Sequence, residues 1–363
     1  MKRYDTLDAM RGVAALLIIV RHTPAFWGGL AFQHSYLAVD FFFLLSGFVV
    51  CHAYEHRLRT DLSALQFMKL RLIRLYPLYA IGLVVSLAGL ALKFYPLPYE
   101  GWKLAWIVAG AALLVPFPSR DQIFPLNGPA WSLWCELAGN LAYAAVVKHL
   151  TDRRLFAIVV VCCAIVMLSA FISHKGGIDG GFTLKTLPVA LARFGFSFGL
   201  GVLICRDRVA AAARGKVRLS LSLAALLILF GLLAFPDLDR WGSGLYAAAC
   251  ACLIFPALVS YAAGYEPPDW LLPLFRALGV CSYPVYILQV PMAVLVSGLL
   301  SHAGHPPESF APWSGLAFVL LLTALSFILV HYVEQPVRQR LRQLAQITRA
   351  HVRRRFLGTR AWD

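Results

Sequence analysis

The sequence is poor in charged residues. Asp, Glu, Lys and Arg make up 14% of its 363 residues, whereas soluble domains carry about 25%. Hydrophobic residues reach 60%, and this balance excludes a predominantly soluble protein. Apolar stretches of about 20 residues, the length that crosses a bilayer, recur from end to end. The sequence therefore predicts an all-α, polytopic membrane bundle.

The sequence also lacks the cysteine patterns of metal sites. Its eight cysteines include no C-x-x-C pair and no cysteine–histidine spacing typical of zinc, and all eight fall in apolar stretches. We interpret them as small buried packing residues without disulfides, and we expect no metal site.

The apolar stretches give the number and position of the spans. We predict about ten transmembrane helices, near 9–27, 37–54, 76–92, 131–148, 155–173, 187–205, 218–235, 243–263, 279–299 and 313–333. A weaker stretch, 102–117, ends in the proline-bearing sequence VPFPS. We interpret it as a re-entrant or interfacial helix.

The positive charges indicate the orientation. With both termini in the cytoplasm, 25 Lys and Arg lie in cytoplasmic segments, six lie in outer loops, and Arg21 and Arg193 lie within spans. A full crossing at 102–117 would reverse this ratio. We therefore expect an inner-membrane protein with a membrane domain at 1–340 and a basic cytoplasmic tail at 341–363 near anionic lipid head groups.

The formal net charge of +15 is thus mainly a topology signal. Nucleic acid is an unsuitable partner because the chain has no soluble basic domain that could bind it.

Arg11 and His22 share one face of the first predicted span. Eleven residues at about 100° each make three turns plus roughly 20°, and the rise separates the two residues by about 16 Å. Ionisable side chains are costly in lipid, so the pair is expected to face a protein interior or a wet cavity. In the alternative interpretation, Arg11 reaches the membrane surface and His22 is a packing residue.

The second span begins with LAVDFFFLLSGF. Asp40 lies near its start, where a carboxylate either caps the helix or takes part in catalysis. Ser46 could bond to its own helix, and Gly47 would let another helix approach closely.

Two further segments carry candidate site residues. Arg71 and Arg74 share a helix face just before the third span, where they either bind phosphates or set the topology. Glu136 follows the outer loop sequence NGPAWSLWC and is expected about one turn inside the membrane. It either pairs with Arg193 or Arg21, or assists proton transfer.

Taken together, these motifs resemble those of the membrane acyltransferase 3 family, over residues 1 to about 340. The resemblance rests on Arg11 with His22, DFFFLLSGF, Arg71-x-x-Arg74-x-x-Pro77, NGPAWSLWCE, Arg193 with FGFSFGLG, SYPVYILQVP and Glu334-x-Pro336. Each motif is weak alone, but seven in this order and spacing are specific.

The resemblance implies an O-acyltransferase. Members move acyl groups, often acetyl from acetyl-CoA, to hydroxyls of extracytoplasmic carbohydrates or glycolipids such as exopolysaccharide or O-antigen. By resemblance, His22 matches the essential histidine of the family, and Arg11, Arg71 and Arg74 match its essential arginines. Gln289 stands where many members have a histidine.

These assignments predict a mechanism. The three arginines would bind the phosphates of cytoplasmic acyl-CoA as a cosubstrate, with no bound cofactor. His22 would act as general base on the acceptor hydroxyl, oriented by Asp40 or Glu136, or would itself carry the acyl group. The expected substrate-binding residues are Ser46, Trp131, Ser132 and Arg193.

A transporter is the alternative from another class. Buried Arg, His, Asp and Glu would suit a proton-coupled carrier or a glycan exporter without acyl chemistry. The two halves of the chain show no similarity that suggests inverted repeats, which argues against it. The acceptor, the acyl chain length and the oligomeric state stay open at this stage.

Overall fold

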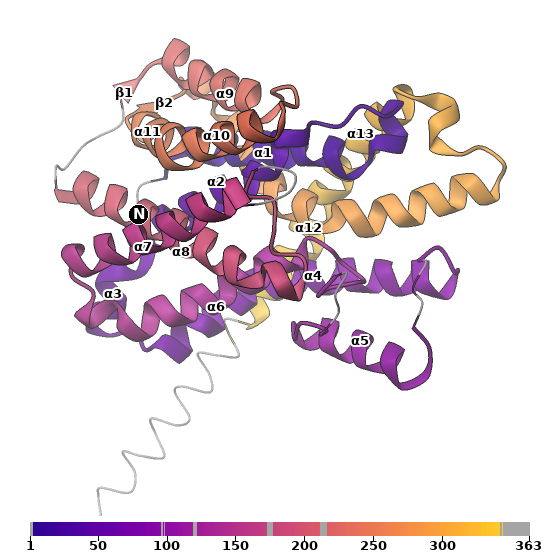
Figure 1. Cartoon of the computed structure of the whole chain (residues 1–363), viewed down its shortest axis with the longest axis horizontal. Helices are drawn as coiled ribbons and strands as arrows, with labels where there is room; N and C mark the ends of the chain where they lie inside the picture. The colour runs from indigo at the N-terminus through magenta and orange to yellow at the C-terminus, as the bar shows by residue number, and fades with distance from the viewer. Residues whose placement is uncertain are drawn as a thin grey trace, which may run out of the picture.

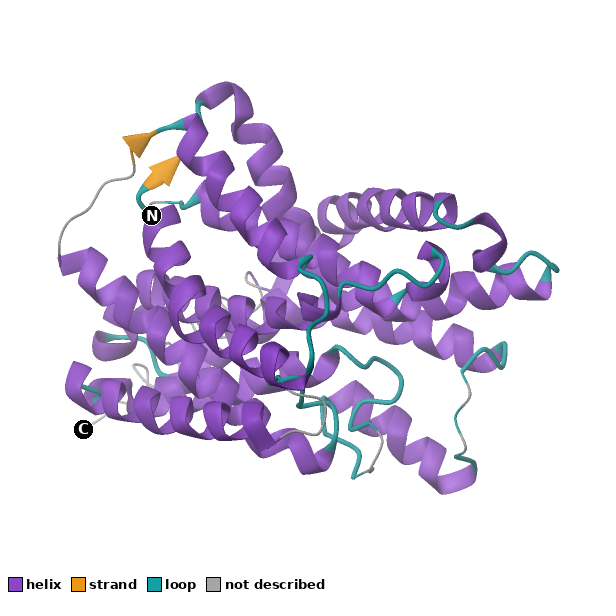
Figure 2. Ribbon diagram, turned by 45° about the horizontal axis from the view of Figure 1, so that its top comes forward, coloured by secondary structure: helices purple, strands orange, loops and turns teal. Residues whose placement is uncertain are grey.

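The computed structural model describes residues 3–341, apart from 96, 98, 119–121, 173–176 and 211–215, together with residue 343. The regular structure in these ranges is helical except for two short strands, β1 (Lys216–Val217) and β2 (Tyr265–Glu266), which pair in parallel at one corner of the molecule (Figure 2). The predicted all-α class is confirmed. Nearly all of the predicted tail at 341–363 lies outside the described residues.

Thirteen α-helices follow one another in the described ranges (Figure 1). They are α1 (Asp5–His22), α2 (Ala38–Val50), α3 (His56–Thr60), α4 (Ala64–Ala91), α5 (Gly101–Leu113), α6 (Ala130–Val146), α7 (Asp152–Ile172), α8 (Leu187–Ala210), α9 (Leu219–Leu233), α10 (Arg240–Ala249), α11 (Phe255–Ala262), α12 (Leu272–His302) and α13 (Trp313–Leu329). Three π-helical segments continue or join them: η3 (Cys51–Glu55), η6 (Cys250–Ile254) and η9 (Val330–Glu334).

The structure describes a multi-pass membrane protein. Seven helical stretches are long and apolar enough to cross a bilayer: Gln33–Thr60, Ala64–Ala91, Asp152–Ile172, Leu184–Arg208, Arg240–Ala262, Asp269–His302 and Trp313–Leu341. The other three predicted spans correspond to α1, α6 and α9. The last two have 17 and 15 residues, and α1 carries four charged side chains. Helix length and composition therefore support seven spans but do not establish the predicted ten.

The pairing of α1 with α12 forms the centre of the bundle, and α4 packs against α12 as well. Both α1 and α12 begin at the same end, where Arg276 pairs with Asp5 at 3.1 Å. We call this the proximal end and the opposite end the distal end. A Cβ at Gly12 would lie 2.4 Å from the Leu278 carbonyl oxygen. Glycine at this position thus lets α1 approach α12 closely.

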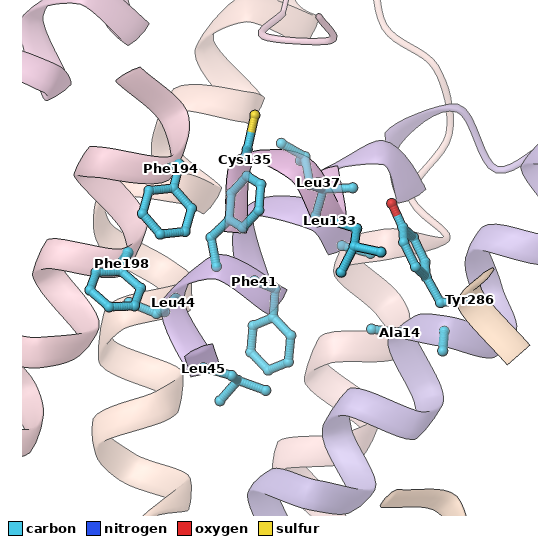
Figure 3. Close-up of a cluster of buried hydrophobic side chains, with 14 of the residues drawn as sticks. Ala14, Leu37, Phe41, Leu44, Leu45, Leu133, Cys135, Phe194, Phe198 and Tyr286 are labelled. Carbon is cyan, nitrogen blue, oxygen red and sulfur yellow. The ribbon is translucent and has the colours of Figure 1, made fainter. Parts of the chain in front are cut away.

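The pairing of α2 with α8 also depends on glycines. A Cβ at Gly47 would lie 2.0 Å from the Phe198 carbonyl oxygen, and one at Gly201 would lie 2.0 Å from the Leu44 carbonyl oxygen. The close helix approach expected at Gly47 is therefore confirmed. Buried aromatic and aliphatic side chains fill the space around this contact (Figure 3).

The helix α5 accompanies only part of α4. The Tyr79 hydroxyl donates to the Ala111 carbonyl at 2.6 Å, so the end of α5 lies beside the middle of α4. The chain then returns toward the distal end, where Ser86 Oγ donates to the Leu126 carbonyl at 2.7 Å. This path fits the re-entrant helix expected at 102–117.

The helix α6 consequently begins inside the protein. Asn127, three residues before it, donates to the Ile287 carbonyl at 3.1 Å. That carbonyl lacks its usual helical partner because Pro291 has no N–H. Glu136, in the second turn of α6, consequently lines the same cavity as Arg11.

Candidate functional site

Two cavities with charged and polar side chains in largely apolar walls lie along one face of α1. The proximal cavity has a volume of about 100 Å³, and Arg11 forms part of its wall. The distal cavity has a volume of about 780 Å³, and His22 forms part of its wall. The face of α1 that carries both residues thus forms part of the wall of each cavity.

Three arginines converge on the proximal cavity. Arg71 and Arg74 come from α4, three residues apart and therefore on one helix face. Arg11 comes from α1 and is held against α12. Its Nε donates to Ser282 Oγ at 2.8 Å, and its Nη2 donates to the Gly279 carbonyl at 3.0 Å. These bonds fix the guanidinium at the cavity wall.

Glu136 lies among these arginines. Its Oε1 accepts hydrogen bonds from Arg71 Nη2 and, at 2.8 Å, from Ser46 Oγ. Arg71 is only 4% exposed, and its Nε has no hydrogen-bond partner among the described residues. Three guanidinium groups face two carboxylates, Glu136 and Asp8, the latter 3.4 Å from Arg11 Nη2. The cavity therefore keeps a positive excess and a buried donor that is not satisfied. Such a cavity suits an anion.

His22 opens into the distal cavity from the last turn of α1. The Gln289 side chain and the Ile18 backbone lie within hydrogen-bonding reach of its imidazole. Gln289 is fully buried on α12, and its Nε2 donates to the Tyr286 carbonyl at 3.1 Å. Its Oε1 has no hydrogen-bond partner within the described ranges, so it is a free acceptor near the imidazole.

Aromatic and amide side chains form much of the remaining distal wall: Gln33, Tyr36, Tyr95, Tyr99, Gln122 and Trp131. Arg21 closes one side of the cavity through an ion pair with Asp179 at 2.5 Å. The Tyr95 hydroxyl donates to the Leu126 carbonyl at 3.0 Å, and burial raises its pKa, so it stays neutral. The distal cavity thus combines flat apolar surfaces, neutral polar groups and one ion pair, Arg21 with Asp179.

The two cavities meet at Val39 and Tyr286, which line both. The Tyr286 hydroxyl lies 2.8 Å from Ser132 Oγ, and its ring packs edge-on against Phe42 with the centroids 5.4 Å apart. Figure 3 shows Tyr286 next to Leu133 at the edge of the buried cluster. Tyr286 thus stands at the junction between the arginine side and the histidine side.

Asp40 and Arg193 form a buried ion pair beside the site. Arg193 Nε and Nη2 donate to the two Asp40 carboxylate oxygens at 2.9 and 2.6 Å, and both residues are at most 2% exposed. Arg193 also donates to the Gly180 carbonyl at 2.7 Å and lies over the Trp131 ring at 5.5 Å. Neither residue is among those that line the two cavities. The pair therefore supports the distal wall from behind.

Eight of the ten predicted site residues line the two cavities, and the other two, Asp40 and Arg193, lie behind the distal wall. The proximal cavity is lined by Arg11, Ser46, Arg71, Arg74, Ser132 and Glu136, and the distal cavity by His22 and Trp131. The carboxylate partner expected for His22 is not found, because Asp40 binds Arg193 and Glu136 binds Arg71. The polar side chain nearest in kind to that partner is the Gln289 amide, whose Oε1 is an unpartnered acceptor among the described residues.

Sequence reasoning missed the position of Tyr286 between the two sides. A signal for it was present, because Tyr286 and Gln289 lie three residues apart in SYPVYILQVP and so share a helix face. The tyrosines of the distal wall carried no such signal. Tyr36 directly precedes LAVDFFFLLSGF but belongs to no quoted motif, and Tyr95 and Tyr99 lie in the segment between α4 and α5.

Comparison with known proteins agrees with these features. The model of the acyltransferase 3 family, described as an acyltransferase domain, matches residues 4–332. "Protein 2 in picA locus" from Rhizobium radiobacter is 36% identical over 183 residues, which cover 47% of this chain and 95% of that protein.

"Acyltransferase MdmB" from Streptomyces mycarofaciens is 28% identical over 189 residues, which cover 48% of this chain and 47% of that protein. The match therefore spans about half the length of that relative. No solved structure matches this chain. Because the family model covers nearly the whole sequence, the chain belongs to the acyltransferase 3 family and is a membrane acyltransferase.

Proposed function

We propose that this protein moves an acyl group, acetyl in the first instance, from cytoplasmic acyl-CoA to a hydroxyl of an extracytoplasmic carbohydrate or glycolipid. The observation that carries the proposal is the pair of cavities, with three arginines on one side of Tyr286 and His22 on the other. Exopolysaccharide or O-antigen would be acceptors of the right class.

The proximal cavity suits the donor. Arginine forks bind phosphate oxygens bidentately, and the free Nε of Arg71 adds a buried donor. A cavity of about 100 Å³ is too small for a whole coenzyme. In this proposal the phosphates stay at the arginines, while the thioester end of the pantetheine arm continues toward Tyr286.

The distal cavity suits the acceptor. Its volume of about 780 Å³ is in the range of small-molecule sites, and its tyrosines and Trp131 offer flat apolar surfaces beside polar groups. These features fit a sugar, which has both apolar ring faces and hydroxyl edges. His22 is the basic side chain that a bound hydroxyl would meet there.

The reaction follows from these positions. His22 takes the proton of the acceptor hydroxyl, and the oxygen attacks the thioester carbonyl carbon. The C–O bond forms and the carbonyl π-electrons move to oxygen. The C–S bond then breaks with its electron pair on sulfur, and the imidazolium returns the proton to give free thiol and an ester. The unpartnered Oε1 of Gln289 is the acceptor that would orient the imidazole through its N–H during both proton transfers.

The orientation in the membrane is part of the same proposal. The proximal end faces the cytoplasm, both termini lie there, and the protein resides in the inner membrane. The support is the distribution of Lys and Arg, 25 against six, between the two sides of the predicted topology. The basic tail at 341–363 would lie near anionic lipid head groups.

Purified protein in detergent, given labelled acetyl-CoA with purified exopolysaccharide or lipopolysaccharide as acceptor, tests the function. We expect release of free thiol and transfer of label to the glycan, both absent in His22→Ala. Wild-type protein that releases no thiol above the heat-inactivated sample would contradict the proposal. Uptake of a glycan into proteoliposomes without thiol release would indicate a transporter instead.

A further inference from the structure

The face of α12 that runs past both cavities carries three polar side chains at helical spacing. Ser282 binds Arg11, Tyr286 binds Ser132, and the Gln289 amide lies beside His22. Residues four and three apart share this face, and the rise places Tyr286 about 6 Å from the Ser282 level and about 4.5 Å from the Gln289 level. Tyr286 therefore lies between the donor side and the general base.

The hydrogen-bond partners of Ser132 control the Tyr286 hydroxyl. Ser132 Oγ lies 3.0 Å from the Pro129 carbonyl and 2.8 Å from the Tyr286 hydroxyl. Ser132 has one proton for these two acceptors. When it donates to Pro129, it accepts the Tyr286 proton. When it donates to Tyr286, the Tyr286 proton is free to point into the junction.

We propose that Tyr286 is a catalytic residue whose hydroxyl donates a hydrogen bond to the carbonyl oxygen of the transferring acyl group, with Ser132 as the positioning residue that supplies the compensating bond. This inference rests on the proposed function, because it needs an acyl donor that reaches the junction from the arginine side. As the acceptor attacks, negative charge develops on that oxygen, and a buried donor already in place stabilises it most.

The surroundings of Tyr286 favour such a role. Tyr286 is only 8% exposed, and Phe42 packs edge-on against its ring. A hydrogen bond in a site that excludes bulk water is stronger than one in water. A phenol also keeps its proton at neutral pH, so it donates without adding charge to the junction.

The test compares Tyr286→Phe, Ser132→Ala and wild type in the purified acetyl-CoA assay. We expect Tyr286→Phe to lower kcat by about 10²–10³-fold, the usual cost of removing one oxyanion donor, with both KM values near wild type. Ser132→Ala should lower kcat less, because it removes only the partner that positions the phenol. Thermal melting of each purified variant controls for folding.

Tyr246→Phe is the matched control. Tyr246 lies in another candidate span and lines neither cavity. Its hydroxyl also makes a hydrogen bond, in this case to the Leu232 carbonyl at 2.6 Å. It should keep wild-type kcat. An equal loss of kcat in both tyrosine variants would assign the effect to folding and overturn the proposal.

Two other results would also overturn it. An unchanged kcat in Tyr286→Phe would mean that the hydroxyl does not contact the reacting carbonyl. Faster thiol release without acceptor would mean that Tyr286 only separates the two cavities. If either result is found while His22→Ala still loses transfer, the role of Tyr286 fails but the proposed function stands. If wild-type protein releases no thiol, the proposed function itself fails.

Discussion

Glu136 holds Arg71 in the proximal cavity through an ion pair that joins α6 to α4. The proposed function places the donor phosphates at this cavity. The carboxylate of α6 contacts the guanidinium of α4, and Ser46 donates to the same oxygen. Glu136 is 22% exposed in its side chain, whereas Arg71 is 5% exposed. An anion that enters the cavity therefore competes with a carboxylate for a largely buried cation.

Replacing Glu136 by glutamine should strengthen donor binding. The substitution removes the competing charge and keeps a side chain of the same size, so the donor KM should fall on the order of tenfold, the equivalent of about 1.4 kcal/mol. The donor-free protein should melt at a lower temperature, because Arg71 loses its counter-ion. Isothermal titration with acetyl-CoA and thermal melting measure the two effects. A donor KM that rises in Glu136→Gln would instead indicate that Glu136 takes part in binding or catalysis.

The arginines should govern the donor rather than the acceptor. Arg71→Ala or Arg74→Ala should raise the donor KM roughly ten- to a hundredfold, since a charge-assisted hydrogen bond is worth about 1.5–3 kcal/mol. Arg71→Lys should restore only part of the affinity, because lysine keeps the charge but lacks the fork. Steady-state kinetics with each substrate varied in turn check this. An unchanged donor KM in all three variants would show that these arginines do not bind the donor and serve only to set the membrane topology.

His22→Ala should abolish transfer while the protein still inserts into the membrane. The imidazole lines the distal cavity, is exposed, and makes no ion pair with a carboxylate in the described part of the chain. Its removal should therefore cost little stability. Expression level and a melting curve of the purified variant report insertion and folding, and thiol release reports activity. Turnover near that of wild type would show that His22 only lines the cavity and takes no part in catalysis.

Asp40→Ala should act on stability. Removing one partner of a buried ion pair costs about 3–5 kcal/mol, because Arg193 then keeps an uncompensated charge at 1% exposure. We expect a large fall in melting temperature and, in the fraction that folds, an activity whose pH profile matches wild type. A normal melting temperature with a shifted pH profile would give Asp40 the catalytic role that its position in the sequence first suggested.

The segment 102–117 should enter and leave the membrane on the same side. In a variant that lacks the native cysteines, Lys103→Cys and Gln122→Cys should both react with an impermeant thiol reagent applied to intact cells. Arg57→Cys, in the inner segment before α4, is the control that should react only after lysis. Labelling of Lys103→Cys from outside, together with Gln122→Cys only from inside, would show a full crossing.

The sequence was informative where a constraint acts along one helix. The spacing of Arg11 and His22 and the position of Gly47 depend only on helical geometry, and both led to correct placements. The all-helical fold followed in the same way from the length of the apolar stretches. The partner of each buried charge depends on how the helices pack against one another, and the spacing of residues along one helix does not predict that packing. Sequence alone left Glu136 with Arg193 or Arg21 as partner, whereas the fold pairs it with Arg71.

The depth of a residue was equally hard to predict. Glu136 was expected about one turn inside the outer surface. In the structure α5 ends beside the middle of α4, α6 begins inside the protein, and Glu136 lies among the arginines. Tyr286 could not be recognised as the junction until α12 was seen between two cavities.

The two cavities differ widely in size, about 100 Å³ on the arginine side and about 780 Å³ on the histidine side. Under the proposed function, the narrow side would favour a short acyl group on the donor, and the wide side would leave room for acceptors of different size. The protein would then be more selective for its donor than for its acceptor.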